Sequence, residues 1–284
     1  MVEPVRMIPL GAAEIAIVNV GRLNLEPLSK CLDVAESDWR LRYLAHFEQP
    51  LTLEMNMVHI ALAGANVLVD AGFDDFSPDS PFQPPESERT LDLVAGLAQA
   101  GIHPEDVTHI VVTHAHDDHY AGITVLRDGS YEPRFPNARC YIGEGDWEAV
   151  RARASAEPTS MEGKTLGVLD RAGLLVPVAE DLELAPGIRA ILTPGESPGH
   201  LIVRVNSAGQ ALYCLGDLYH DSVEVEQPTW MFRGRDVKAM LASRQSLVRA
   251  ALAEDALLVA THIPGVGRLS RTAEAVMWVE VPSL

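Results

Sequence analysis

Cysteine and basic residues are both scarce in this sequence. The three cysteines, Cys31, Cys140 and Cys214, are odd in number and widely spaced. That spacing gives no disulfide framework and favours small core residues in a reducing compartment. The 22 Lys and Arg stand against 40 Asp and Glu, which leaves a formal net charge of -18. Because phosphate binding needs clustered cations, this charge argues against a nucleic-acid partner and against an anionic membrane surface.

Long apolar runs and targeting signals are missing as well. No stretch of about 18 apolar residues occurs, so we expect no membrane span. Residues 1–21 lack a charged region followed by a long apolar run and a small-residue cleavage site. We therefore expect a cytoplasmic protein. The sequence has 47% hydrophobic and 22% charged residues over 284 positions, which is enough to bury a sizeable core.

The most unusual stretch is His114-Ala115-His116-Asp117-Asp118-His119. Three imidazoles and two carboxylates within six residues need compensating partners, which indicates a divalent cation. Residues 107–113 before it are β-branched and apolar, as in a buried strand. The cluster therefore begins where a strand ends, and there a loop can present ligands from a rigid scaffold.

Other polar side chains also follow strand-like runs. His200, Asp217 and His262 come after the expected strands 188–193, 211–215 and 256–261. Each of them alone is compatible with an ordinary hydrogen-bonded polar residue at a strand end. Together with His114, they indicate that these strand ends meet at one edge of the fold. Asp70 ends another apolar strand and needs a partner if it is buried. Orienting a metal-ligating His would supply that partner, and capping a turn is the alternative.

The rest of the chain alternates strands and helices. We expect strands over 14–20, 58–69 with a turn at 64–66, 138–142 and 201–206, and helices over 90–100, over 146–154 and after Asp236. Residues 21–55, 77–89 and 155–167 are expected to be irregular. The aromatic-rich segment 21–55 is a flap over a pocket, a subunit contact or a patch that caps the core. Arg244 falls on the apolar stripe of the last helix and is either snorkelling or held by a buried acid.

The motifs, taken in their order along the chain, resemble those of the metallo-β-lactamase superfamily. The resemblance runs from about Val58 to Gly267 and includes Asp70, residues 113–119 and 193–200, Asp217 and His262. It implies an α/β (α+β) fold, an αββα sandwich of two mixed β-sheets flanked by helices. We expect residues 1–284 to form a single domain, with residues 1–57 as an N-terminal extension that serves as a flap or a dimer contact.

The resemblance also implies two divalent metal ions. It assigns His114, His116 and His200 to one ion and Asp118, His119 and His262 to the other, with Asp217 bridging both. This set of nitrogen and oxygen donors suits Zn and would also accept Mn, Fe or Co. The family's diiron flavoproteins carry a Glu at the position of His116, which disfavours redox chemistry here. A hydroxide between the two ions is a nucleophile at neutral pH, and Asp118 can orient it and shuttle its proton.

Residues 216–220 and 262–267 resemble N-acyl homoserine lactonases and methyl-parathion-hydrolase-like enzymes. This implies a hydrolase of a small lactone or carboxylic ester, with side activity on phosphotriesters. Such lactonases place a Tyr where this chain has His220. Two interpretations are open: Tyr219 or His220 hydrogen-bonds the scissile carbonyl, or Tyr219 is a packed residue beside a surface His220. Glu196 stands where many relatives carry a His that is not a metal ligand.

Two other functions are open alternatives, a glyoxalase-II-like thioesterase and a non-catalytic metal-binding sensor. The sequence has no basic run to hold an anionic thiol carrier, and the sensor would have a damaged ligand set. The remaining histidines that match no motif are expected to be structural; they are His46, His59, His103 and His109.

Overall fold

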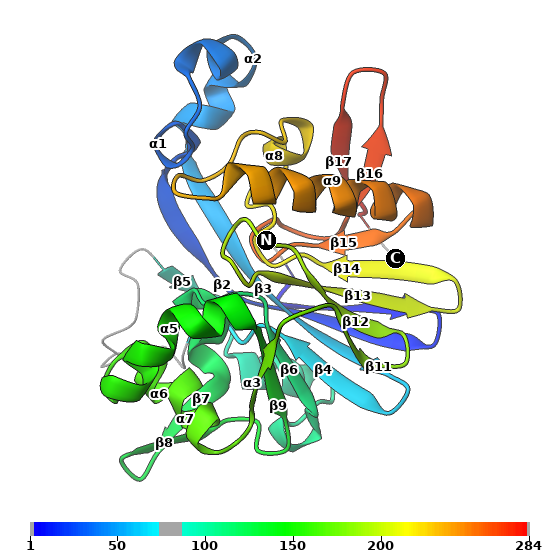
Figure 1. The fold of residues 1–284 in the computed structure, drawn as a ribbon. Coiled ribbons are helices and arrows are strands. Elements are labelled where there is room, and N and C mark those ends of the chain that lie inside the picture. Colours follow the sequence, from blue (N-terminus) through cyan, green and yellow to red (C-terminus); the bar gives the residue numbers. More distant parts are fainter. Residues whose placement is uncertain (1–2, 74–86, 283–284) are drawn as a thin grey trace.

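Two β-sheets lie face to face, and helices cover their outer faces (Figure 1). The computed structural model describes residues 3–73 and 87–282. The first sheet is built from β1 (Val5–Leu10), β2 (Ala13–Pro27), β3 (Pro50–Leu62), β4 (Ala65–Val69), β5 (Ser87–Arg89), β6 (His109–Val112), β9 (Arg139–Gly143) and β10 (Leu175–Val178). Their order is β1-β2-β3-β4-β6-β9-β10, with β5 paired to β2. Pairing is antiparallel from β1 to β4 and parallel from β4 to β10, so the sheet is mixed.

The second sheet follows the order of the chain. It contains β11 (Leu182–Ala185), β12 (Ile188–Leu192), β13 (Leu201–Ser207), β14 (Gln210–Cys214), β15 (Leu257–Val259), β16 (Gly267–Arg271) and β17 (Val276–Glu280). Only the pair β14–β15 is parallel among these described strands. A separate hairpin joins β7 (Thr124–Arg127) to β8 (Ser130–Pro133).

Apolar residues fill the space between the sheets and the space under the helices. The helices α3 (Leu93–Gln99), α5 (Glu144–Ala156), α6 (Met161–Lys164) and α7 (Leu166–Arg171) pack on the first sheet, and α9 (Val237–Glu254) packs on the second. In β3, Met55 and Met57 pack under the helices, whereas Val58 and Ile60 face the other sheet. This alternation is that of a strand buried on both faces. The layers confirm the expected αββα sandwich.

The long helix α9 begins and packs as its sequence indicates. The side chain of Asp236 accepts a hydrogen bond from Ala239 N at 3.0 Å, which caps the helix. Arg244 is 1% exposed, and its Nη2 lies 3.0 Å from Glu224 Oε2. A buried acid therefore holds this arginine, and the snorkelling alternative is wrong.

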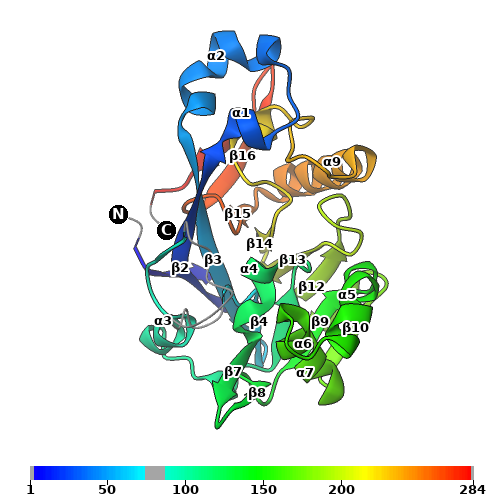
Figure 2. The same cartoon turned by 90° about the vertical axis from the view of Figure 1, so that its left-hand side faces the viewer.

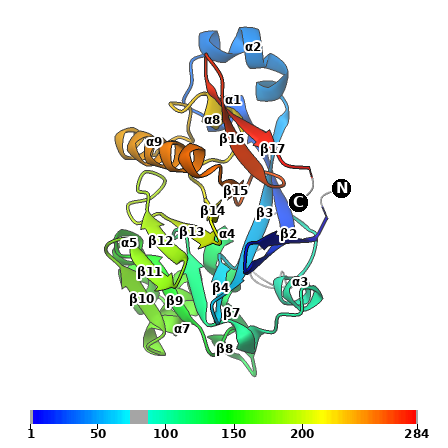
Figure 3. The same cartoon turned by 90° about the vertical axis from the view of Figure 1, so that its right-hand side faces the viewer.

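Residues 21–55 were expected to be irregular, and this was wrong. The strand β2 continues to Pro27, and α1 (Leu28–Cys31) and α2 (Glu36–Glu48) precede β3. Figures 2 and 3 show α1 and α2 at the end of the β2–β3 ribbon, and Figure 1 shows α8 (Val223–Glu226) between them and the β16–β17 hairpin. Trp39 stacks on Phe47 with ring centroids 5.0 Å apart, and Phe47 packs on Trp230. The aromatic patch therefore fixes this segment to the loop after β14, and the expected dimer contact stays a prediction.

Two other segments also differ from expectation. In the segment 155–167, which was expected to be irregular, the end of α5, the whole of α6 and the start of α7 are helical. Residues 87–89 form β5, while residues 77–86 of the expected loop lie outside the described residues. All three cysteines are free thiols, and Cys140 and Cys214 are buried in the core. Within the described ranges, no helix is both long and apolar enough to cross a membrane.

Candidate metal centre

One edge of the sandwich gathers the residues that the sequence singled out. The parallel strands β4 and β6 end there, as do β14 and β15. The strand β13 runs antiparallel to β14 and therefore begins at the same edge. The residues carried by these ends are Asp70 after β4, His114 to His119 after β6, His200 before β13, Asp217 after β14 and His262 after β15. The short helix α4 (Asp117–Tyr120) completes the loop after β6.

Asp217 lies at the centre of this edge and is 2% exposed. Its Oδ1 is 3.3 Å from His119 Nε2. Its Oδ2 is 3.2 Å from the Nε2 atoms of both His220 and His262, and 3.5 Å from His114 Nε2. One buried carboxylate therefore meets four imidazole nitrogens.

The other predicted side chains surround Asp217. Asp118 Oδ2 lies 3.6 Å from His119 Nε2 and 3.5 Å from His262 Nε2, while His114 Nε2 lies 2.7 Å from His116 Nδ1. Among the described residues, three sets have donor atoms within 4.8 Å of one another: His114, His116, Glu196 and Asp217; Asp118, His119 and His262; and Asp217, His220 and His262. His200 belongs to none of these sets, and its Nε2 accepts a hydrogen bond from Asp217 N at 3.2 Å.

Hydrogen bonds from the far side of the rings fix two of the imidazoles. His119 Nδ1 lies 2.8 Å from Asp70 Oδ2, and His262 Nδ1 lies 2.8 Å from the carbonyl oxygen of Glu54. A carboxylate and a carbonyl can only accept, so each Nδ1 is the donor. Each ring is thereby fixed with its Nε2 turned toward Asp217, which is how metal-ligating histidines are held.

Asp70 is itself tightly held. Its carboxylate accepts hydrogen bonds from Thr113 N at 2.7 Å and from Thr113 Oγ1 at 2.9 Å. The backbone of Asp70 has a φ of 59°, a left-handed conformation that Asp adopts more readily than most residues. These contacts bring Asp70 against His119, which is the arrangement that the sequence favoured over a turn cap.

Asp146 and Asn56 are positioning residues that sequence reasoning missed. The Asp146 carboxylate accepts hydrogen bonds from Ala115 N at 2.9 Å and from Gly199 N at 2.7 Å, so it joins the loop after β6 to the turn before β13. Asn56 Nδ2 donates to the carbonyl oxygens of Ala260 and Ile263 and fastens the loop that carries His262. An acid in the first turn of a helix is ordinary, so no local signal marked Asp146.

The electrostatics of the centre fit a bound cation. Burial lowers the pKa of His200 to about 3 and the pKa of His114 well below its ordinary value, so both are neutral. Burial opposes the charge on Asp217, yet His119 and His262 hold its pKa well below the usual range. Burial also opposes a charge on His119, but Asp217 and Asp118 raise its pKa well above the ordinary value. The cluster therefore favours positive charge at its centre.

Unsatisfied polar atoms support the same conclusion. In the described part of the chain, His119 Nε2 and Asp217 Oδ1 are buried and form no hydrogen bond, although they lie 3.3 Å from each other. A buried polar atom without a partner costs about 1–3 kcal/mol, and an ion is one explanation for it. The residues form a candidate dinuclear metal site, and their nitrogen and oxygen donors suit Zn, Mn, Fe or Co.

Tyr219 and His220 lie in different surroundings. The ring of Tyr219 is buried under α9, with the Arg244 guanidinium 4.7 Å from its centroid. His220 is buried beside Asp217 and stacks on Phe232 at 4.1 Å. The expectation that Tyr219 contacts substrate is therefore not supported by its position, whereas His220 faces the centre.

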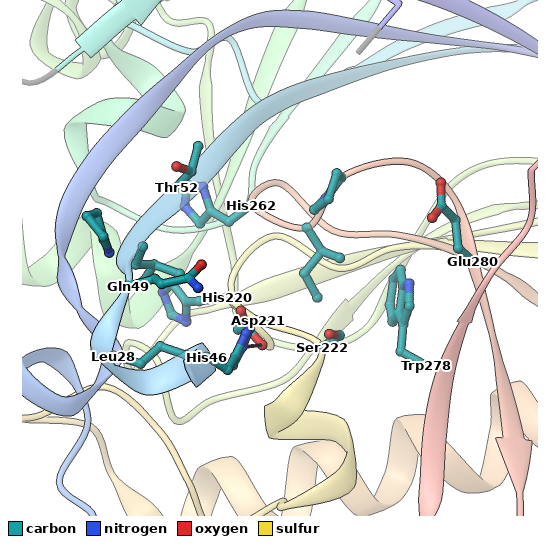
Figure 4. Close-up of a pocket in the computed structure, with 14 residues that line it drawn as sticks. Leu28, His46, Gln49, Thr52, His220, Asp221, Ser222, His262, Trp278 and Glu280 are labelled. Carbon is teal, nitrogen blue, oxygen red and sulfur yellow. Dashed lines mark hydrogen bonds and ion pairs between the residues drawn. The ribbon is translucent and has the colours of Figure 1, made fainter. Parts of the chain in front are cut away.

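A cavity of about 470 Å³ adjoins the centre. His220 and His262 line one part of it, and Trp278 and Glu280 line another (Figure 4). His46 of α2 also lines it and lies 3.0 Å from Asp221 Oδ1. The N-terminal segment thus forms part of the cavity wall. His46, His59, His103 and His109 belong to none of the three donor sets.

Comparison with known proteins identifies the family. The model of the metallo-beta-lactamase superfamily matches residues 56–262, which include every candidate metal ligand. The chain belongs to the metallo-beta-lactamase superfamily, and the resemblance drawn from its motifs is confirmed.

Curated relatives include several lactonases. An N-acyl homoserine lactonase of Bacillus cereus is 25% identical over 224 residues, which cover 78% of this chain and 79% of that protein. The N-acyl homoserine lactonase AiiA of Bacillus thuringiensis subsp. kurstaki is 26% identical over 180 residues, covering 62% of this chain and 63% of AiiA. The second alignment spans less than two thirds of that relative.

Solved structures share the fold over nearly the whole chain. One is AidC, described as a dizinc quorum-quenching lactonase in complex with a product, with a TM-score of 0.78 and 22% identity over 99% of this chain and 98% of AidC. Another is a probable metal-dependent hydrolase from Staphylococcus aureus, with a TM-score of 0.79 and 21% identity over 98% of this chain and 100% of that one.

Proposed function

We propose that this protein is a metal-dependent hydrolase that opens lactones or cleaves carboxylic esters. The observation that carries the proposal is the buried carboxylate of Asp217 with four imidazole nitrogens within 3.5 Å. The proposed ligands are His114, His116, Asp118, His119, His200 and His262, with Asp217 between the two ions. The lactonase relatives support the substrate class.

The chain's own residues supply the rest of the chemistry. Two divalent cations bound here would activate a water molecule at neutral pH and polarise the substrate carbonyl. Asp118 has a side chain 13% exposed at the edge of the centre, so it can accept the proton of the attacking water and pass it on. His220 can donate a hydrogen bond to the carbonyl oxygen. Asp70 holds the ring of His119 by a hydrogen bond to its Nδ1, which orients Nε2 toward the centre.

The cavity favours a neutral substrate with an apolar part. Leu28, Ile263 and Trp278 supply apolar surface, while Asp221 and Glu280 place carboxylates in the wall. Carboxylates repel anions, which disfavours an anionic thioester carrier as substrate. A volume of about 470 Å³ lies in the range of small-molecule sites, so an acylated lactone of moderate size fits.

Acid release in a pH-stat tests this proposal. The panel is a set of homoserine lactones with short and long acyl chains, a δ-lactone, an aryl ester, a phosphotriester and a glutathione thioester. The metal-loaded protein should hydrolyse lactones or esters, and His116→Ala should abolish this. His109→Ala serves as a matched control, because His109 lies outside the centre and stacks on Tyr141.

Each outcome separates the alternatives. Thioester turnover alone would favour a glyoxalase-II-like enzyme. No acid release from any substrate of the panel, with two metal ions bound, would refute the hydrolase and favour a metal-binding protein without catalytic activity. Equal loss in both variants would point to general damage to the fold.

A further inference from the structure

Glu196 is a buried carboxylate at the metal centre that the family resemblance does not use. It lies in the turn before β13, and its side chain is 0% exposed. Its Oε1 is 3.6 Å from His116 Nδ1 and 4.0 Å from His220 Nε2. Together with His114, His116 and Asp217 it forms a set of donors that lie within 4.8 Å of one another. Glu196 therefore stands where a ligand of the His114–His116 ion can stand.

Arg235 holds this carboxylate from the outside. Arg235 Nε donates to Glu196 Oε2 at 2.5 Å, and its Nη2 forms an ion pair with Oε1. A carboxylate has about four lone-pair positions, so pairing with arginine leaves capacity for a metal ion. Ligating carboxylates are themselves commonly hydrogen-bonded from behind.

A purely structural role explains these contacts less well. The loop of Arg235 is already attached to the same turn, because Asp236 N donates to Gly195 O at 3.0 Å. Fastening the loop does not require a carboxylate oxygen directed at two histidines of the centre. Burying a charge is costly unless it is paired. Here Arg235 contacts both carboxylate oxygens, and Oε1 also lies toward the imidazoles of His116 and His220.

We propose that Glu196 is an additional ligand of the ion on the His114–His116 side and that Arg235 is its positioning residue. This inference rests on the proposed function, since it assumes that the centre binds metal. A further carboxylate makes the donor set richer in oxygen. Oxygen ligands suit Mn more than nitrogen ligands do, so Glu196 should improve the binding of Mn relative to Zn at this position.

Metal affinity of Glu196→Gln tests the inference without relying on activity. Metal-free protein is titrated with Mn²⁺, and the free ion is monitored by electron paramagnetic resonance. A separate titration with Zn²⁺ is carried out in competition with a chelating dye. Glu196→Gln should weaken one of the two ions by about tenfold or more, with a larger loss for Mn²⁺ than for Zn²⁺. Glu183→Gln is the matched control, because Glu183 is exposed on β11 and its loss removes the same charge.

A second variant guards against a failure to fold. Glu196→Asp keeps the charge but retracts the carboxylate by one methylene, so it should also weaken one ion while thermal unfolding of the metal-free protein stays near that of the parent. Two ions bound with unchanged affinity in Glu196→Asp and in a folded Glu196→Gln would overturn the inference and leave the proposed function intact. Absence of metal binding in the parent protein would overturn both.

Discussion

Replacing Arg244 with Met should destabilise the protein strongly. The guanidinium is buried and donates to the carbonyl oxygens of Leu218, Pro228 and Trp230 and to the carboxylate of Glu224. Burial raises the pKa of Glu224 and Arg244 opposes that shift, so the variant leaves a buried carboxyl without its balancing charge. Breaking a buried pair in this way costs about 3–5 kcal/mol.

The change should also reach the metal centre. Glu224 Oε2 accepts a hydrogen bond from His220 N at 2.9 Å, so the loop after Asp217 depends on the same carboxylate. At roughly 2–4 °C per kcal/mol for chains of this size, the melting temperature should fall by about 10 °C. Turnover of a lactone should fall with it, because His220 loses its fixed position.

The change in the free energy of unfolding is measured by urea unfolding, with circular dichroism as the readout. Arg249→Met is the matched control, since Arg249 is exposed on the same helix and its loss should change stability little. The double variant Arg244→Met with Glu224→Leu should recover at least half of the loss, because it removes the unpaired charge. A loss below about 1 kcal/mol in Arg244→Met alone would refute the reasoning.

Three further predictions follow from single residues. Burial lowers the pKa of His59 to about 4, so its neutral ring contributes fully to stability above the unfolded-state pKa of about 6.5 and less as the pH falls. The free energy of unfolding should therefore fall by about 2 kcal/mol between pH 7 and pH 5. Urea unfolding of His59→Phe at the two pH values should lack this loss. Asp146→Ala leaves one buried and one partly buried N–H group unpaired and should cost about 3 kcal/mol in the same assay, and a cost near zero would contradict its bridging role. Gly216→Ala would place a Cβ 2.9 Å from His200 Nε2 and should lower metal affinity in a chelator competition, whereas Gly209→Ala, with a similar positive φ and open space around it, should not.

Much of the site could be predicted because its residues share one local pattern. Each polar side chain follows an apolar strand, and strand ends meet at one edge of a sheet, so sequence alone could collect Asp70, His114, Asp217 and His262. Glu196 could not be recognised in this way. Its partner Arg235 lies 39 positions away and its proximity to His116 depends on how two loops pack.

The N-terminal segment shows the limit of periodicity in the fold. Trp39 and Phe47 of α2 are buried, but Leu41 on the same helix is 98% exposed. This mixture blurs the apolar stripe by which a helix is recognised. The helix is held by aromatic contacts with Trp230, which comes from a distant part of the chain. Such contacts leave no local signature.

Acid release from N-hexanoyl homoserine lactone, measured at increasing ratios of metal to metal-free protein, tests the central claim most directly. The proposed ligands on the two sides of Asp217 predict that turnover rises until two ions are bound per chain and then stays constant. A plateau at one ion per chain, or no turnover at any ratio, would contradict a dinuclear lactone hydrolase.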